Sequence, residues 1–226
     1  MTKINLSKKQ ISKILSDVSE QLPSPPTAVR DLYSLPAGIQ LKYANSDDRR
    51  PIIQDLCDHI GFYLGILSRI DIQLVDDIEG SFDFVVDNRG TAIGKHRYPF
   101  AGMYATNFAG RRKIYIANEQ QYRFDNLAAI MAHECTHNYV HIHKIDCNEV
   151  DGEILTDTLS AYLGLGFLLL KGYESFGLSI GYITDKSIKN TMLCAMKTRK
   201  WRPKEIAARF ESVWDKFHTH IHSFFS

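Results

Sequence analysis

Apolar residues recur at helical spacing near the start of the chain. On an otherwise polar segment, residues 5–20 carry four such positions: Ile11, Ile14, Leu15 and Val18. Positions three and four residues apart share one face of a helix, so an amphipathic helix is expected here. The stretch "QLPSPPT" (21–27) contains three prolines and predicts the end of this helix and a linker. A second helix is expected from residue 46 to about residue 67, because the acidic residues in "NSDDRRP" suit a helix N-terminus.

Four short segments with strand character follow this second helix. They are "IDIQLV" (70–75), "FDFVV" (82–86), "AGMYAT" (101–106) and "RKIYIA" (112–117). The turn signals "DNRG" and "NFAGR" lie between them and indicate breaks between successive strands. We therefore expect a small mixed or antiparallel sheet.

The pattern becomes almost wholly helical from Asp125 onward. Helices are expected near 126–142, 151–171, 185–199 and 203–221. A sheet region followed by a run of helices indicates the α+β class, with a largely helical C-terminal half. We divide the chain into an N-terminal helix with its proline-rich linker (1–27) and one domain (28–226). Within that domain the sheet covers about 70–117, two central helices about 126–171, and the C-terminal helices about 185–221.

The composition is that of an ordinary soluble globular protein. Of 226 residues, 44% are apolar and 23% are charged, and the net charge is +1. Basic residues cluster only briefly, in "GRRK" (110–113) and "KTRKWRPK" (197–204), whereas a nucleic-acid site needs an extended basic face. We therefore expect no nucleic-acid partner.

The cysteines and the apolar runs predict a cytoplasmic protein without a membrane span. Its four cysteines are widely spaced and form no C-x-x-C pair, which favours a reducing compartment. The N-terminal segment lacks the continuous apolar core of a secretory signal. The apolar run "AYLGLGFLLL" (161–170) is too short to cross a bilayer and predicts a buried core helix. Export by a route that needs no signal peptide stays open as an alternative.

One stretch, "AAIMAHECTHNYVHIHKIDC" (128–147), concentrates residues that bind metals. His133 and His137 are four residues apart and project from one face of the expected helix. Two imidazoles so placed bind one zinc ion, and Glu134 lies beside the metal, where it accepts a proton from a zinc-bound water. This is the H-E-x-x-H arrangement. The competing interpretation is a helix face with two ordinary histidines, one of them in the core.

A catalytic zinc site usually takes three protein ligands, so a third ligand is needed. Histidines 133, 137 and 141 on a straight helix are spread over roughly 12 Å and cannot converge on one ion. His143 has the histidine spacing of the metzincin proteases, but Val140 stands where those proteins have a glycine that lets the backbone turn back. On an unbroken helix His143 points roughly 120° away from His137. The metzincin alternative is therefore the weaker one.

The next helix offers a better third ligand. In "DGEILTDTLSAYLGLG" (151–166), Glu153 and Asp157 are four residues apart and share a face. A helical hairpin closed by "KIDCNEV" would lay this face against the H-E-x-x-H helix. Glu153 would then complete a His, His, Glu site, and Asp157 would accept a hydrogen bond from the far ring nitrogen of His133. The competing interpretation is that both acids simply suit the first turns of a helix.

"HECTH" followed by "GEILTD" resembles the gluzincin, or thermolysin-like, group of zincin metallopeptidases, whose pattern is H-E-x-x-H and a downstream E-x-x-x-D. The resemblance covers roughly residues 100–172. The short interval between the two motifs is similar to that of the compact single-domain gluzincins. It implies one catalytic zinc ion per chain, held by His133, His137 and Glu153, with Glu134 as general base and Asp157 as the acid that orients a ligand. It also implies that "AGMYAT" or "RKIYIA" is the sheet edge along which a peptide lies as an added strand.

The expected function is therefore zinc-dependent hydrolysis of peptide bonds in a peptide or protein substrate. Two alternatives remain: a zinc-dependent hydrolase of a non-peptide amide or ester, and a non-catalytic metal-binding interaction protein. The residue that stabilises the transition state is left open among Tyr162, Tyr173 and Tyr182. Cys135 is expected to be a packing residue. The N-terminal helix is expected to pack on the domain, with self-inhibition and docking of a regulatory partner as alternatives.

Overall fold

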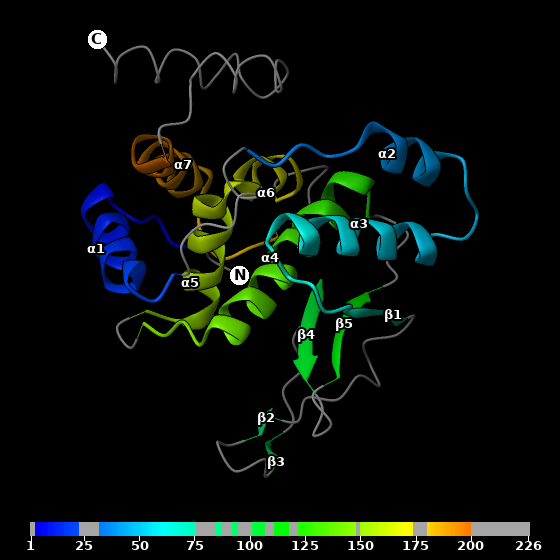
Figure 1. Ribbon diagram of the computed structural model, residues 1–226, viewed down its shortest axis with the longest axis horizontal. Coiled ribbons are helices and arrows are strands. Elements are labelled where there is room, and N and C mark those ends of the chain that lie inside the picture. The colour runs from blue at the N-terminus through cyan, green and yellow to red at the C-terminus, as the bar shows by residue number, and fades with distance from the viewer. Residues whose placement is uncertain are drawn as a thin grey trace.

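A small sheet packs against helix α4 (Phe124–His143), and further helices surround α4 in the computed structural model (Figure 1). The expected α+β class is confirmed. The structure describes residues 3–22, 32–75, 85–86, 92–94, 101–106, 111–117, 122–147, 150–173 and 180–199. The predicted features that lie outside these ranges are the linker beyond residue 22, strand residues 82–84 and the helix 203–221.

The sheet is mixed and has the strand order β1-β5-β4. β1 (Asp71–Val75) pairs in parallel with β5 (Arg112–Ala117), and β4 (Gly102–Thr106) pairs antiparallel with β5. β5 is therefore central and buries Ile114 and Ile116, whereas β4 lies at an edge and packs on α4. A separate antiparallel pair joins β2 (Val85–Val86) to β3 (Ala92–Gly94), a strand that was not predicted.

The first helix forms where the apolar spacing predicts it and belongs to the main core. α1 (Lys8–Ser19) begins after Ser7, whose hydroxyl accepts from the Gln10 backbone N–H at 3.3 Å. The Gln10 side chain in turn accepts from the Ser7 N–H at 2.9 Å, which completes a capping box. The four predicted apolar residues are buried in one cluster with the sheet, and α1 packs on α7 (Asp185–Arg199).

The second predicted helix is shorter than expected. Instead of 46–67, α3 covers Arg50–Tyr63. Pro51 lies in its first turn, where a missing N–H costs nothing, and Gly65 follows its end with a φ of 75°. The acidic residues of "NSDDRRP" therefore precede the helix. A helix that was not predicted, α2 (Ala37–Ala44), lies before them and buries only Ile39.

The predicted helix 151–171 is interrupted at its middle. α5 (Gly152–Ser160) and α6 (Gly166–Gly172) flank a π-helical turn, η2 (Ala161–Leu165), in which Gly164 has a φ of 105°. Positive φ favours glycine, so this residue sets the kink. By length and composition the whole span Gly152–Gly172 could cross a membrane, but 78% of its most apolar window is buried inside the protein. Burial to this extent agrees with the predicted core helix.

The packing of α1 predicts that the helix contributes to the stability of the whole domain. Ile14 is 4% exposed, so Ile14→Ala should lower the free energy of unfolding by about 2–5 kcal/mol. Urea denaturation measures this change. Leu41→Ala, at a side chain that is 66% exposed, is the control and should cost less than about 0.5 kcal/mol. An unchanged midpoint for Ile14→Ala would show that α1 is detached from the core in solution.

Candidate metal centre

Helix α4 supports the site because small and apolar residues let other elements approach it on several sides. Polar contacts then fix its neighbours. The Ser160 hydroxyl of α5 donates to the Thr136 hydroxyl at 2.7 Å, and Asn126 Nδ2 donates to the carbonyl of Gly172 at 2.7 Å. Ser160, Thr136 and Asn126 are fully buried. α5 and α6 are thereby held against α4, which brings the predicted acidic face of α5 towards the two histidines.

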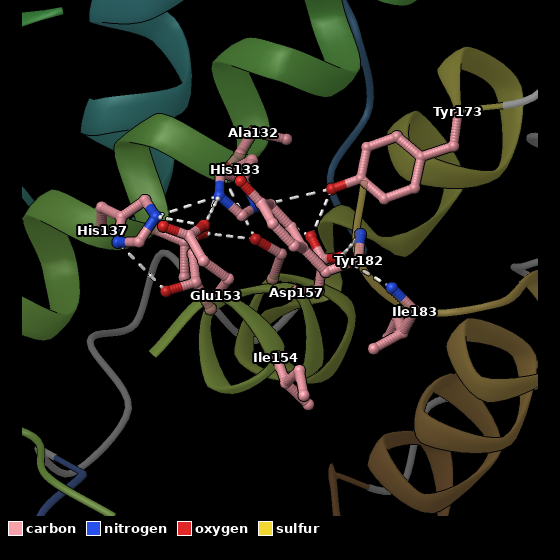
Figure 2. A network of polar contacts seen from close by, with 12 residues as sticks. Ala132, His133, His137, Glu153, Ile154, Asp157, Tyr173, Tyr182 and Ile183 are labelled. Atoms are coloured by element: carbon pink, nitrogen blue, oxygen red, sulfur yellow. Dashed lines mark hydrogen bonds and ion pairs between the residues drawn. The ribbon is translucent and has the colours of Figure 1, made fainter. Parts of the chain in front are cut away.

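The side chains of His133, His137 and Glu153 converge on one point (Figure 2). Glu153 Oε2 lies 2.9 Å from His133 Nε2 and 3.1 Å from His137 Nε2, and the two Nε2 atoms are 2.9 Å apart. Ligand atoms of a tetrahedral zinc ion lie roughly 3.3 Å apart, given metal–ligand bonds of roughly 2.0–2.1 Å. The two nitrogens and one oxygen therefore form a donor set that could hold a metal ion.

Asp157 lies directly behind His133. Its Oδ1 accepts from His133 Nδ1 at 2.7 Å and from the hydroxyl of Tyr173, and its Oδ2 accepts from the backbone N–H groups of Tyr182 at 2.8 Å and Ile183 at 3.2 Å (Figure 2). The carboxylate is fully buried. Because the contact places one proton of His133 on Nδ1, Nε2 is the ring nitrogen that faces Glu153, and loss of its own proton would leave its lone pair for a metal. Asp157 thus lies where the sequence predicted it.

Thr156 orients the second histidine, a role that the sequence analysis missed. Its Oγ1 donates to the carbonyl of Gly152 at 2.8 Å, so its single proton is used there. The same oxygen lies 3.2 Å from His137 Nδ1 and must therefore accept from that nitrogen. The His137 Nε2 lone pair then faces the converging point. Thr156 follows Glu153 by three residues and shares its helix face, which is the sequence signal that could have found it.

Glu134 is buried and only partly hydrogen-bonded. The side chain lies close to β4: a Cβ added at Gly102 would come within 2.8 Å of Glu134 Oε1. The backbone N–H of Tyr104 donates to the carboxylate, but Oε2 has no hydrogen-bond partner among the described residues. Burial raises the pKa of Glu134, while the nearby imidazoles of His133 and His137 oppose the rise. A buried carboxylate oxygen beside the candidate metal ligands fits a group that handles a proton there.

The histidine and carboxylate charges in the cluster stabilise one another. Burial lowers the pKa of His133, but the carboxylates of Asp157 and Glu153 outweigh burial and hold that pKa well above its ordinary value. Burial raises the pKa of Glu153, but hydrogen bonds with His133 and His137 outweigh it and hold that pKa well below its usual range. A metal ion that binds to these atoms must therefore displace a proton from the cluster.

The remaining histidines of the stretch do not join the cluster. α4 continues without a break through Val140 to His143, and the backbone turns only at Lys144, which has a φ of 52°. His143 packs against Tyr139, with ring centroids 4.4 Å apart. His141 lies beside Tyr104, with ring centroids 6.0 Å apart. The metzincin alternative would need the turn at Val140, so it is wrong for this fold.

Cys135 and the three tyrosines that the sequence left open lie at different places relative to the cluster. Cys135 is fully buried, with its Sγ 3.8 Å from Cys57 Sγ, as expected of a packing residue. The hydroxyl of Tyr173 is used by Asp157, and Tyr162 lies under the guanidinium of Arg199. Tyr182 stacks on His133, with ring centroids 5.5 Å apart and planes at 24°. Of the three tyrosines left open, Tyr182 therefore lies over the face of a candidate metal ligand.

An open hollow adjoins the cluster at His137. It has a volume of about 570 Å³ and is lined by Tyr104 of β4 and by the last turns of α4, including Val140 and His141. The hollow lies between the edge strand of the sheet and the helix that carries both histidines. A bound molecule could therefore reach the converging ligand atoms along β4.

Comparison with known proteins adds no identification, because no family model, curated protein or solved structure matches this chain. The chemistry of the site therefore rests on its own geometry. That geometry consists of three convergent atoms that could hold a metal ion, two oriented imidazoles and one buried carboxylate beside them.

The donor set predicts that Glu153, and not His143, completes the metal site. Purified wild-type protein should contain one zinc ion per chain by elemental analysis after dialysis. Glu153→Ala removes one of the three converging atoms and should lose the ion, whereas His143→Ala should retain it. The opposite pattern, with zinc lost only in His143→Ala, would contradict the assignment.

The hydrogen bond from His137 to Thr156 predicts a weaker but measurable effect. Thr156→Val keeps the shape of the side chain and removes the hydroxyl, so the dissociation constant for zinc should rise by about 10-fold. Competition with a chromophoric chelator measures it. Thr158→Val is the matched control, because Thr158 is buried on the same helix and its hydroxyl donates only to the carbonyl of Ile154 at 2.7 Å. Equal zinc dissociation constants for Thr156→Val and Thr158→Val would contradict the role given to Thr156.

Proposed function

We propose that this protein is a zinc-dependent metallopeptidase of the gluzincin type. The observation that carries the proposal is the convergence of His133 Nε2, His137 Nε2 and Glu153 Oε2 next to the buried carboxylate of Glu134. The downstream "GEILTD" supplies both Glu153 and Asp157, in the spacing that the resemblance to gluzincins implies. Two imidazoles and a carboxylate are a common donor set for catalytic zinc.

His133, His137 and Glu153 would hold the zinc ion. When bound, the ion supplies a water of lowered pKa and a Lewis acid that polarises the scissile carbonyl. Asp157 and Thr156 hold the two imidazoles with Nε2 towards the converging point, so binding of the ion would displace a proton but would not need the ligands to reorient. Three protein ligands leave a coordination position for the reaction, which distinguishes a catalytic site from a closed structural one.

Glu134 would act as the general base. Its carboxylate accepts the proton of the attacking water and then transfers this proton to the leaving amine. Oε2, which has no hydrogen-bond partner within the described part of the chain, leaves one carboxylate oxygen for that proton, and the Tyr104 N–H holds the side chain in place. Tyr182, stacked on His133, is the candidate of the three tyrosines for contact with the reacting carbonyl.

A peptide substrate would bind along β4. β5 is bonded to a strand on each side, so "RKIYIA" has no free edge and cannot accept an added strand. β4 pairs only with β5 among the described strands, and its residue Tyr104 reaches both Glu134 and the hollow beside His137. An extended peptide added to β4 would pass beside the base and the metal ligands, with a side chain in the hollow.

We place this activity in the cytoplasm. All four cysteines are free thiols, and three of them are buried. Cys57 and Cys135 remain thiols although their sulfur atoms are only 3.8 Å apart, which suits a reducing compartment.

The role of Glu134 predicts that binding and catalysis can be separated. Glu134→Gln keeps the size of the side chain and removes the base, so it should bind zinc like the wild type but lose hydrolysis of a peptide library by about 10²–10⁴-fold. Turnover is measured by mass spectrometry of the cleaved peptides. Glu20→Gln, an exposed position at the end of α1, is the control and should cleave at the wild-type rate.

Two results would count against the peptidase assignment. Turnover by Glu134→Gln at the wild-type rate would show that Glu134 is not the general base. Cleavage of small amides or esters by the zinc-loaded wild type, without cleavage of any peptide, would instead assign the site to non-peptide substrates.

A further inference from the structure

The N-terminal segment pairs with the chain just before α7. Ile4 forms a parallel bridge with Ile183. The Ile4 N–H donates to the carbonyl of Tyr182 at 2.8 Å, and the Thr184 N–H donates to the carbonyl of Ile4 at 3.0 Å. We call residues 4–6 the N-terminal strap. The strap therefore binds one side of the backbone of residues 182–184.

The end of the strap is fixed by a buried polar contact. The Leu6 N–H donates to Ser187 Oγ at 2.7 Å, and both Leu6 and Ser187 are buried. Ser7 then caps α1, whose apolar face is part of the core. The strap is thus held at one end by α1 and at the other by its pairing with residues 182–184.

The same backbone segment supplies half of the donors to the carboxylate of Asp157. The N–H groups of Tyr182 and Ile183 point to Asp157 Oδ2, while the Tyr182 carbonyl and the Thr184 N–H point to the strap. Gly181, with a φ of 85°, precedes the segment, and a Cβ there would overlap the ring of Tyr173. The position of these two donors thus depends on the backbone path and not on side-chain identity.

A buried carboxylate needs such donors. Leaving a charged group with unsatisfied hydrogen bonds in the interior is costly, so displacement of residues 182–183 would be accompanied by movement of Asp157. Asp157 orients His133, whose Nε2 belongs to the metal-binding set. A continuous series of contacts therefore leads from Ile4 through the segment 182–184 and Asp157 to His133.

The N-terminal helix does not cover the site. α1 packs on α7 and α5, and no described residue of α1 lines the hollow beside His137. Gln21, which follows α1, does contact the lining of the hollow, because its side chain bonds the backbone of Asp146 at 2.9 and 2.8 Å. α1 therefore packs on the helices around the site and leaves the hollow open, whereas an inhibitory segment would close it.

We propose that the N-terminal strap is a positioning element of the metal centre, so that removal or displacement of residues 4–6 weakens metal binding. The inference rests on the metal-binding part of the proposed function and deepens it with a means of regulation. Proteolytic trimming before Ser7 would switch the centre off, whereas trimming of a covering segment would switch it on.

The test compares two substitutions at one position in the full chain. Ile4→Pro removes the N–H that donates to Tyr182, while Ile4→Ala keeps the backbone bonds and changes a side chain that is 45% exposed. Competition with a chelator should give a dissociation constant for zinc about 10-fold higher for Ile4→Pro than for Ile4→Ala, which should resemble the wild type. Deletion of residues 1–6 should weaken binding at least as much as Ile4→Pro.

A second measurement uses the metal-free protein and does not depend on zinc binding. The amide protons of Tyr182 and Ile183 should exchange with solvent about 10-fold faster in Ile4→Pro than in Ile4→Ala. If the wild type binds no zinc, the proposed function fails, and faster exchange alone would still support the strap. Equal exchange rates in Ile4→Pro and Ile4→Ala would overturn the role given to the strap. If the wild type binds zinc, equal zinc affinities of these two variants would overturn it as well.

Circular dichroism will show whether Ile4→Pro is folded. If it is not, Ser187→Ala replaces it, because this variant removes the acceptor of the Leu6 N–H without changing the backbone of the strap. Ser19→Ala, which removes an exposed hydroxyl that bonds only within α1, is its control. The same two measurements apply, with weaker zinc binding and faster exchange expected for Ser187→Ala, and values equal to those of Ser19→Ala would overturn the proposal.

Discussion

The buried carboxylate of Asp157 is the constraint to which the other elements of the site conform. Burying a carboxylate costs less free energy the more completely its oxygens are hydrogen-bonded. Here the partners come from α4, from the end of α6 and from the segment before α7, through His133, Tyr173, Tyr182 and Ile183. One charge therefore fixes the relative position of α4, α5, α6 and the start of α7. The three atoms that could hold a metal ion lie next to this fixed point.

The parts of the site that local spacing determines could be predicted from the sequence. His133 and His137 share a face because they are four residues apart on one helix, and Glu153 and Asp157 do so for the same reason. α4 also continues through Val140 to His143, as the poor fit of a β-branched residue to a positive-φ turn predicts. These inferences needed only the geometry of a helix and one hairpin between two neighbouring helices.

The parts that depend on distant contacts could not be predicted. The donors from Tyr182 and Ile183 lie 25 and 26 residues from Asp157 and belong to the backbone, so no residue type signals them. Gly164 interrupts a run that is apolar on every face, where no periodicity marks the break. The edge of the sheet was also undetermined, because "AGMYAT" and "RKIYIA" both have strand character and only the pairing order shows which of them lies at the edge.

The contact between Leu6 and Ser187 joins residues 181 positions apart, and this separation affects the order in which the protein matures. Contacts between distant parts of a chain form late, since the loop between them must first be closed. During synthesis the strap can form its contact with Ser187 only after Ser187 has left the ribosome. The two histidines and Glu153 emerge earlier, but the contacts of the strap with residues 182–184 and Ser187 are incomplete until then. A nascent chain would thus complete this long-range contact only after Ser187 has emerged, when α4, α5 and α6, which surround the candidate centre, have already left the ribosome.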